Sequence, residues 1–354
     1  MAGHRLPTFR SDCSRAGAGT ESECSHRAGQ GACAGLHSRA LTRQLLLDSA
    51  ALCIPNGAVP IAVIFNPTAQ GNRARRWLTH LEALRGQCKL FPTTRPGEAI
   101  GLAQAAVEEG FDTVVAAGGD GTVNEVANGL AAAKDGLARA RLGVLPWGSV
   151  NVFGKELNLP TRFDEAWAML RAGRERLIDL GWIEFQKSAR AQRRCFVQLA
   201  GAGLDACAVE LVQWNLKQRF GDLAYVWAGW QALGRALPQI TVRANGTELH
   251  GQLVLVGNGR FYGGRHAIFP DARLDDGLID VVVIEEVRRW RCLQYGWAVL
   301  RDRVSRMAGA HYLQTAAVEL VSAERAPLEL EGDAVGELPA TISVARSALR
   351  VVVP

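Results

Sequence analysis

The chain has 354 residues, 48% of them hydrophobic and 21% charged, which is typical of a folded protein large enough for two domains. It has no run of 18 apolar residues to span a membrane, and residues 1–20 lack the apolar core of a secretory signal. The formal net charge of +5 suits an anionic partner, but no basic stripe interleaved with base-stacking aromatics favours nucleic acid. We therefore expect a cytoplasmic protein and leave its oligomeric state open.

The first half of the chain begins with a segment of unusual composition. Residues 1–58 are rich in Gly, Ser, Arg, Ala and His without periodicity, and we interpret them as a disordered extension without an assigned function. Helices then separate four predicted strands, at residues 59–65, 87–91, 112–117 and 142–145. Such alternation predicts a parallel sheet with helices on both faces. We expect an α/β nucleotide-binding domain over 59–172, to which a final strand at about 346–354 returns.

The second half is dominated by short strands. They are predicted at 177–185, 194–199, 239–244, 248–256, 278–284, 316–321, 328–331, 341–344 and 348–353. Two helical stretches interrupt them, at 205–237 and 287–307. This order predicts a β-rich domain over 173–345, a sandwich or partly closed barrel with two helical excursions.

One loop in the first half suggests phosphate binding. The sequence VVAAGGDGTVNE at 114–125 predicts a buried strand, a tight glycine turn and a helix start. Free backbone N–H groups at a helix N-terminus favour an anion such as phosphate. Asp120 in this turn would repel phosphate unless a cation lay between them, so the loop predicts a nucleotide site that uses Mg²⁺. Taken alone, the loop could equally be an ordinary glycine-rich turn.

Further polar loops occur along the chain in a defined order. They are Asn66-Pro67, LPWGSVN at 145–151, GAGLDA at 201–206, GNG with GG at 257–264, the segment 270–277 with its Asp-Asp-Gly turn, and EGD at 331–333. Together with the glycine loop they resemble the diacylglycerol kinase catalytic-domain family, in the bacterial soluble branch that is similar to sphingosine kinases. The resemblance covers about residues 59–354. It implies transfer of a phosphoryl group from ATP to a lipid hydroxyl, in a cleft between an α/β domain of the NAD kinase and diacylglycerol kinase type and a β-sandwich lipid-binding domain.

The resemblance also implies roles for single residues. The expected nucleotide contacts are Asn66, Thr93, Gly118, Gly119, Asp120, Gly121, Thr122, Val123, Asn124 and Ser149. Ser149 stands where the family usually has Thr, and it keeps the hydroxyl. Asp120 is the candidate for the catalytic Mg²⁺, through water. A structural Mg²⁺ is expected at Arg273, Asp276 and Leu278, through one carboxylate and two backbone carbonyls.

The candidate general base departs from the family pattern. The family uses an Asp of an Asp-Gly-Glu triplet, and this chain has Glu331-Gly332-Asp333. The longer Glu side chain moves its carboxylate by roughly 1 Å, a displacement that can cost on the order of 10²-fold in rate. Either the pocket has adjusted, or Asp333 has taken the role, or the enzyme is slow. The catalytic candidates are thus Glu331, Asp333 and Asp120.

The two helical stretches bear on the membrane question. Both mix tryptophans with basic residues, as helices at a membrane–water interface do, and we expect peripheral contact with a membrane that holds the lipid substrate. The alternative is that these aromatics face the core. Two other functions are also considered. One is a soluble-substrate kinase such as NAD kinase, which shares the GGDGT loop. The other is a catalytically weak or inactive lipid-binding homologue, which Glu331 suggests.

Overall fold

The computed structural model describes residues 61–67, 72–84, 86–188, 190–211 and 223–354, so the predicted extension at 1–58 lies outside the described residues. Four strands form a parallel sheet in the order β2-β1-β3-β4. Their bounds are β1 (Ile61–Phe65), β2 (Lys89–Pro92), β3 (Thr113–Gly118) and β4 (Arg141–Pro146). Every residue of β1, β3 and β4 is buried, which explains why these strands are apolar apart from Thr113 and Arg141 at the starts of β3 and β4.

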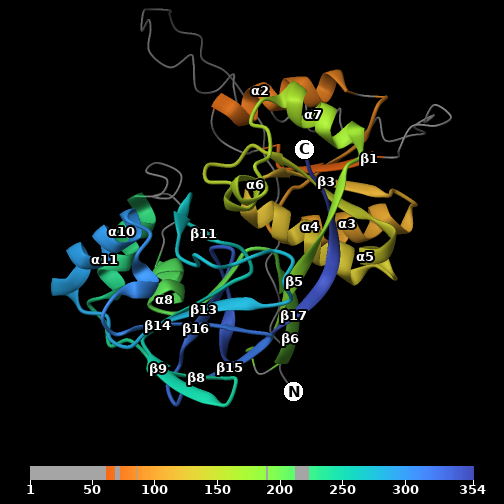
Figure 1. The fold of residues 1–354 in the computed structure, drawn as a ribbon. Coiled ribbons are helices and arrows are strands. Elements are labelled where there is room, and N and C mark those ends of the chain that lie inside the picture. The colour runs from red at the N-terminus through yellow and green to blue at the C-terminus, as the bar shows by residue number, and fades with distance from the viewer. Residues whose placement is uncertain (1–60, 68–71, 85, 189, 212–222) are drawn as a thin grey trace, which may run out of the picture. The chain divides into compact units, whose positions relative to one another are not determined.

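Helices cover both faces of this sheet (Figure 1). On one face lie α2 (Asn72–Ala83) and α7 (Phe163–Ala172), where Trp77 meets Phe163 edge to face. On the other face lie α3 (Glu98–Glu108), α4 (Asp120–Ala132) and α5 (Gly136–Arg139). A short helix, α6 (Val152–Glu156), follows β4. The first half is therefore the expected α/β layer structure.

The second half is built from antiparallel strands. They are β5 (Glu175–Lys187), β6 (Arg190–Phe196), β7 (Leu199–Gly203), β8 (Ile240–Ala244), β9 (Thr247–Gly251), β10 (Leu253–Gly257), β13 (Ile279–Ile284), β14 (Ala310–Thr315), β15 (Ala317–Val321), β16 (Pro327–Leu330) and β17 (Asp333–Val352), with a small separate pair of β11 (Phe261–Tyr262) and β12 (His266–Ala267). Strands β14-β13-β10-β7-β16-β17 lie side by side, and β8, β9 and β15 pair around the β17 side. Buried Val, Ile and Leu side chains of these strands form their own core. The α/β plus β-sandwich fold class is confirmed.

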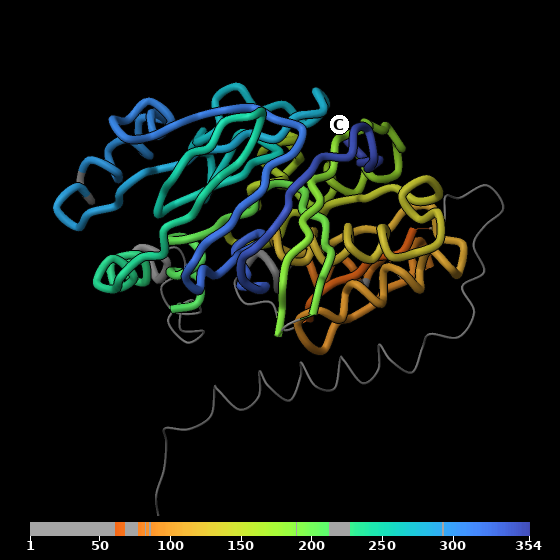
Figure 2. Tube along the Cα trace, turned by 90° about the horizontal axis from the view of Figure 1, so that it is seen from below, coloured from red at the N-terminus to blue at the C-terminus, as the bar shows by residue number. Residues whose placement is uncertain are grey.

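Two long strands belong to both halves. Strand β17 pairs antiparallel with β5 from Glu337 to Val352, and its end pairs parallel with β4 at Val351 and Leu142. Figure 2 shows β5 and β17 running together along this length. Strand β17 also pairs antiparallel with β16, and the turn at 331–333 joins these two strands.

Some element boundaries differ from the sequence predictions. The strand predicted at 248–256 is two strands, β9 and β10, because Gln252 turns away between them and its backbone N–H bonds to Ile284. The helix predicted at 287–307 is shorter. It is α11 (Cys292–Leu300), preceded by η1 (Arg289–Arg291) and followed by η2 (Val304–Arg306). Strand β14 was not predicted, because its half-buried residues show little alternation.

The other helical stretch is described only in part. Helices α8 (Leu204–Leu211) and α10 (Leu223–Ala232) lie within the range 205–237, and residues 212–222 between them are outside the described residues. Across the part of the chain that the structure describes, no helix is both long enough and apolar enough to cross a bilayer.

Candidate active site

The loops predicted to bind nucleotide meet at one edge of the parallel sheet. Thr93, at the end of β2, is buried and donates its backbone N–H to the Phe65 carbonyl at 2.8 Å. The Gly148 N–H bonds to the Gly118 carbonyl at 3.2 Å, which joins the loops after β3 and β4. Ser149, in the second of these loops, is exposed. Parallel strands end at a common edge, so four separate loops are brought together there.

The contact between the two glycine loops leaves no room for a side chain. A Cβ on Gly148 would lie 2.4 Å from the Gly119 Cα, and a Cβ on Gly118 would lie 2.4 Å from the Thr122 Oγ1. Backbone therefore packs directly on backbone. Such close approach is what a loop needs if its N–H groups are to surround a phosphate.

Helix α4 begins in the glycine loop and is aimed at this edge. Gly119 is its N-cap and Asp120 its first residue. The Asp120 carboxylate accepts the backbone N–H groups of Val152 and Phe153, both at 3.0 Å. Burial raises the pKa of Asp120, while these two N–H groups and the Lys155 ammonium oppose the shift. Asp120 thus ties the start of α4 to the start of α6.

The next residues of α4 have structural contacts. The Glu125 carboxylate accepts the N–H groups of Gly97 and Ala99 at 2.8 and 3.1 Å, and so satisfies donors at the start of α3. Asn124 is buried, and its side-chain oxygen accepts from Asn128. The Asn128 amide also bonds both the N–H and the carbonyl of Cys195, at 3.0 and 2.8 Å. Helix α4 is therefore fixed to α3 and to β6.

The turn between β16 and β17 carries the two carboxylates proposed as bases. Glu331 and Gly332 have positive φ angles of 53° and 83°. The Glu331 Oε1 atom accepts the backbone N–H groups of Val197, Gln198 and Leu199, at 3.0, 2.7 and 3.4 Å. Burial, and after it the charge of Asp120, raise the pKa of Glu331 to about 8 in spite of these three donors. Glu331 is thus held firmly next to Asp120.

Asp333 differs from Glu331 in its surroundings. It is exposed, and its Oδ2 atom lies 3.3 Å from the position of a Cβ on Gly121 in the glycine loop. Its negative charge contributes to raising the pKa of Glu125, although burial of Glu125 is the larger cause. Of the two carboxylates, Asp333 is the one that reaches the glycine loop from the open side.

A further pair of acids, Glu329 and Asp205, was missed by sequence reasoning. Glu329 is fully buried two residues before Glu331, and its Oε2 atom accepts the Gly332 N–H at 2.7 Å. Its carboxylate lies against that of Asp205, which also accepts the Tyr262 hydroxyl at 2.5 Å. Burial raises the pKa of both acids. The alternation of acids at 329, 331 and 333 was the available signal.

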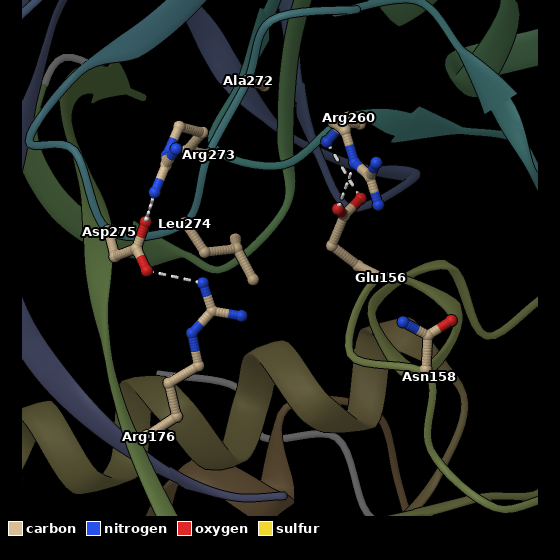
Figure 3. Close-up of a pocket in the computed structure, with 8 residues that line it drawn as sticks. All are labelled: Glu156, Asn158, Arg176, Arg260, Ala272, Arg273, Leu274 and Asp275. Carbon is tan, nitrogen blue, oxygen red and sulfur yellow. Dashed lines mark hydrogen bonds and ion pairs between the residues drawn. The ribbon is translucent and has the colours of Figure 1, made fainter.

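The residues predicted to hold a structural Mg²⁺ lie in a different place. Arg273 lines a polar cavity of about 270 Å³ (Figure 3), where Asp275 pairs with both Arg176 and Arg273. The Asp276 carboxylate accepts the Leu278 N–H at 2.9 Å, and Arg346 donates to the Asp276 carbonyl. Arginines already balance much of the negative charge of this turn. A metal ion held by Arg273, Asp276 and Leu278 stays a prediction.

The glycine-loop side has the opposite charge balance. The carboxylates of Asp120, Glu331 and Asp333 lie on this side, and burial of Glu331, followed by the charge of Asp120, raises the pKa of Glu331. The charge of Lys155 opposes the rise in the pKa of Asp120, and the charge of Arg194 opposes the rise in the pKa of Glu125. An oxygen-only donor set with excess negative charge suits Mg²⁺. Within the described residues, however, no group of three or more acids, histidines or cysteines is placed to hold a metal ion by itself, so Mg²⁺ at this edge stays a prediction.

Comparisons with known proteins show which families the chain is similar to. The family description "Diacylglycerol kinase catalytic domain" matches residues 60–183, and "YegS C-terminal NAD kinase beta sandwich-like domain" matches residues 198–353. A diacylglycerol kinase of Staphylococcus carnosus is 27% identical over 303 residues, covering 82% of this chain and 94% of its own. One from Staphylococcus aureus is 28% identical over 286 residues, covering 78% and 87%. A crystal structure of a diacylglycerol kinase from Bacillus anthracis superposes with a TM-score of 0.61 at 18% identity, covering 85% and 98%.

Proposed function

The chain belongs to the diacylglycerol kinase family, and we propose that it transfers the γ-phosphate of ATP to the hydroxyl of diacylglycerol or a related long-chain lipid. One observation carries the proposal. The turn with Glu331 and Asp333 comes from the β-rich half and lies against the glycine loop of the α/β half. A phosphate donor on one side and a proton acceptor on the other is the arrangement that phosphoryl transfer to an alcohol needs.

The glycine loop and helix α4 are proposed to bind the phosphates of ATP. Gly118, Gly119 and Gly121 let the backbone approach, and the start of a 13-residue helix favours negative charge. Thr122, Val123 and Asn124 form the first turns of α4 and would hold this loop or contact the nucleotide. Asn66, Thr93 and Ser149 are proposed as further nucleotide contacts at the neighbouring strand ends.

Asp333 is proposed to accept the proton of the lipid hydroxyl. Its carboxylate is exposed beside Gly121, where a hydroxyl could approach the terminal phosphate. Glu331 is proposed to position the turn, because its Oε1 atom is already used by three backbone N–H groups. Asp120 is proposed to contact Mg²⁺ through water, and the ion when bound would supply charge neutralisation at the phosphates.

A direct assay tests this proposal. Purified full-length protein is incubated with [γ-³²P]ATP, Mg²⁺ and diacylglycerol in mixed micelles, and labelled lipid is measured. We expect Asp333→Asn to lower kcat by about 10²-fold or more, the usual contribution of a general base. Glu331→Gln keeps an oxygen for the three N–H donors and should cost less. The matched control is Glu319→Gln on β15, an exposed acid whose ion pair with Arg243 is worth little.

The outcomes separate the candidate functions. A larger loss in Glu331→Gln than in Asp333→Asn would assign the base to Glu331 instead. Labelled NADP⁺ formed from NAD⁺, with no labelled lipid, would favour a soluble-substrate kinase. Lipid binding without any labelled product would favour a catalytically inactive homologue.

A further inference from the structure

Large apolar side chains are exposed mainly on one part of the surface. Among the described residues, five of the six exposed large hydrophobics lie on α10 or on the η1–α11 segment, and each is between 48 and 69% exposed. They are Trp227, Trp230, Trp290, Trp297 and Leu300. The alternative that the aromatics of these helices face the core is therefore wrong for these four tryptophans. Clustered apolar exposure of this kind marks an interaction surface.

Arginines are placed directly over these tryptophans. The guanidinium carbon of Arg301 lies 4.2 Å from the ring centre of Trp297, and that of Arg291 lies 4.8 Å from Trp290. Arg289 lies 5.8 Å from the Trp230 ring centre and donates to the Leu233 carbonyl at 3.1 Å. This hydrogen bond joins η1 to the chain just after α10. We call the surface formed by these tryptophans and arginines the Trp–Arg face.

The charge of the Trp–Arg face defines its partner. Residues 285–306 contain six arginines and three acids. One of the acids, Glu286, pairs with Arg288, and another, Asp302, accepts the Ala267 N–H. The surplus positive charge lies among exposed indoles. Indole rings favour the interfacial layer of a membrane, and arginine favours anionic headgroups.

We propose that the Trp–Arg face docks the protein on a bilayer that contains anionic phospholipid. This proposal rests on the proposed lipid kinase function, because a kinase that acts on a long-chain lipid must find its substrate in a membrane. Helix α10 packs on α8 through Ala228, Ala232 and Ala208. Helix α8 in turn places Asp205 next to Glu329, two residues from Glu331. Helices α10 and α8 thus lie between the Trp–Arg face and the turn that carries Glu331.

Vesicle sedimentation tests the proposal. The full-length protein is mixed with sucrose-loaded vesicles of pure phosphatidylcholine, or of phosphatidylcholine with 30% phosphatidylglycerol. We expect binding to the anionic vesicles that weakens in high salt. Trp290→Ala with Trp297→Ala should lower the partition coefficient about tenfold or more. Arg291→Gln with Arg301→Gln should lower the preference for anionic over neutral vesicles, by about fivefold for each arginine removed.

Matched controls come from outside the face. Leu177→Ala removes the other exposed large hydrophobic side chain, and Arg193→Gln removes an exposed arginine that stacks on Trp182 at 3.9 Å. Both should bind vesicles within twofold of the unchanged protein. Thermal unfolding of all variants should be similar, because the changed side chains are exposed, apart from Arg291, which is half-buried.

The outcomes keep this proposal separate from the kinase proposal. Equal vesicle binding by the tryptophan variant and the unchanged protein would overturn it. So would self-association in light scattering that Trp297→Ala abolishes, since the face would then bind a second copy. If the protein binds vesicles but labels no lipid, the docking face stands and the kinase proposal fails. If it labels a short-chain diacylglycerol in micelles but binds no vesicle, the docking proposal alone fails.

Discussion

Replacing Gly148 by alanine tests the contact between the two glycine loops. A Cβ at this position would lie 2.4 Å from the Gly119 Cα and 3.0 Å from the Gly119 backbone nitrogen. Ordinary contacts between carbon atoms are about 3.5–4.0 Å, so one loop must move by roughly 1 Å. The obstacle is backbone rather than the end of a flexible side chain, and it cannot simply swing away.

Two measurable effects should follow. Overpacking of this kind typically costs about 1–3 kcal/mol of stability, which leaves most of the protein folded. A displacement of about 1 Å at a phosphate-binding loop should lower kcat/KM for ATP by on the order of 10²-fold. The assay is steady-state transfer from [γ-³²P]ATP, with urea unfolding measured on the same preparation.

A second glycine provides the matched control. Gly101 lies inside helix α3, and a Cβ there would meet nothing within 4 Å. Gly101→Ala should therefore keep full activity and raise stability by roughly 0.5–1 kcal/mol, because glycine is unfavourable inside a helix. If Gly148→Ala is folded and within threefold of normal activity, the loops do not touch as described and the reasoning fails.

Three further changes probe other contacts. Asn128→Ala leaves the N–H and carbonyl of Cys195 unpaired and should cost about 2–4 kcal/mol in urea unfolding; a loss under 0.5 kcal/mol would contradict the clamp. Lys155→Met removes an ammonium group that favours the ionised form of Asp120 beside the phosphate loop. It should raise the KM for ATP about tenfold and leave the free energy of unfolding in urea unchanged. Burial raises the pKa of Asp280 from 3.8 to about 6, so the folded state binds this proton more tightly than the unfolded state and stability falls as pH rises from about 4 to 6. Asp280→Asn has no carboxyl to titrate, so it should not lose stability in this way. Between pH 4 and pH 7.5 the stability of the variant minus that of the unchanged protein should rise by up to about 3 kcal/mol. A difference that does not change with pH would refute the assignment.

The α/β half was the more predictable part from sequence. Its buried strands are short apolar runs such as Ile61–Phe65, and each is followed by a polar or glycine-containing loop. Because parallel strands share one edge, the order of the strands alone brings the loops at Thr93, Gly118 and Gly148 together. Local pattern and tertiary position agree in this half.

The acidic part of the site was less predictable, because its geometry depends on pairing between distant strands. The Glu331 carboxylate is fixed by N–H groups at 197–199, more than 130 residues earlier. Whether Glu331 or Asp333 faces the glycine loop follows from the positive φ angle of Glu331, which the residue type does not reveal. Glu329 was missed because its alternation with the acids at 331 and 333 does not show that it is buried against Asp205.

The aromatic helices show the same limit. Tryptophan spacing on a helix is compatible with a buried face or an exposed one, and sequence alone left both open. Trp290 and Trp297 are exposed, and they lie on η1 and on an α11 that is shorter than the helix predicted at 287–307.

The long pair of strands β5 and β17 has a consequence for how the chain unfolds. Ile178 and Leu349 belong to the core of the α/β half, whereas Ile183 and Ile342 belong to the core of the β-rich half. Neither core can melt without withdrawing strands from the other. The two halves should therefore unfold in a single cooperative transition, and neither half should be obtained as a stable fragment by cutting the chain between them.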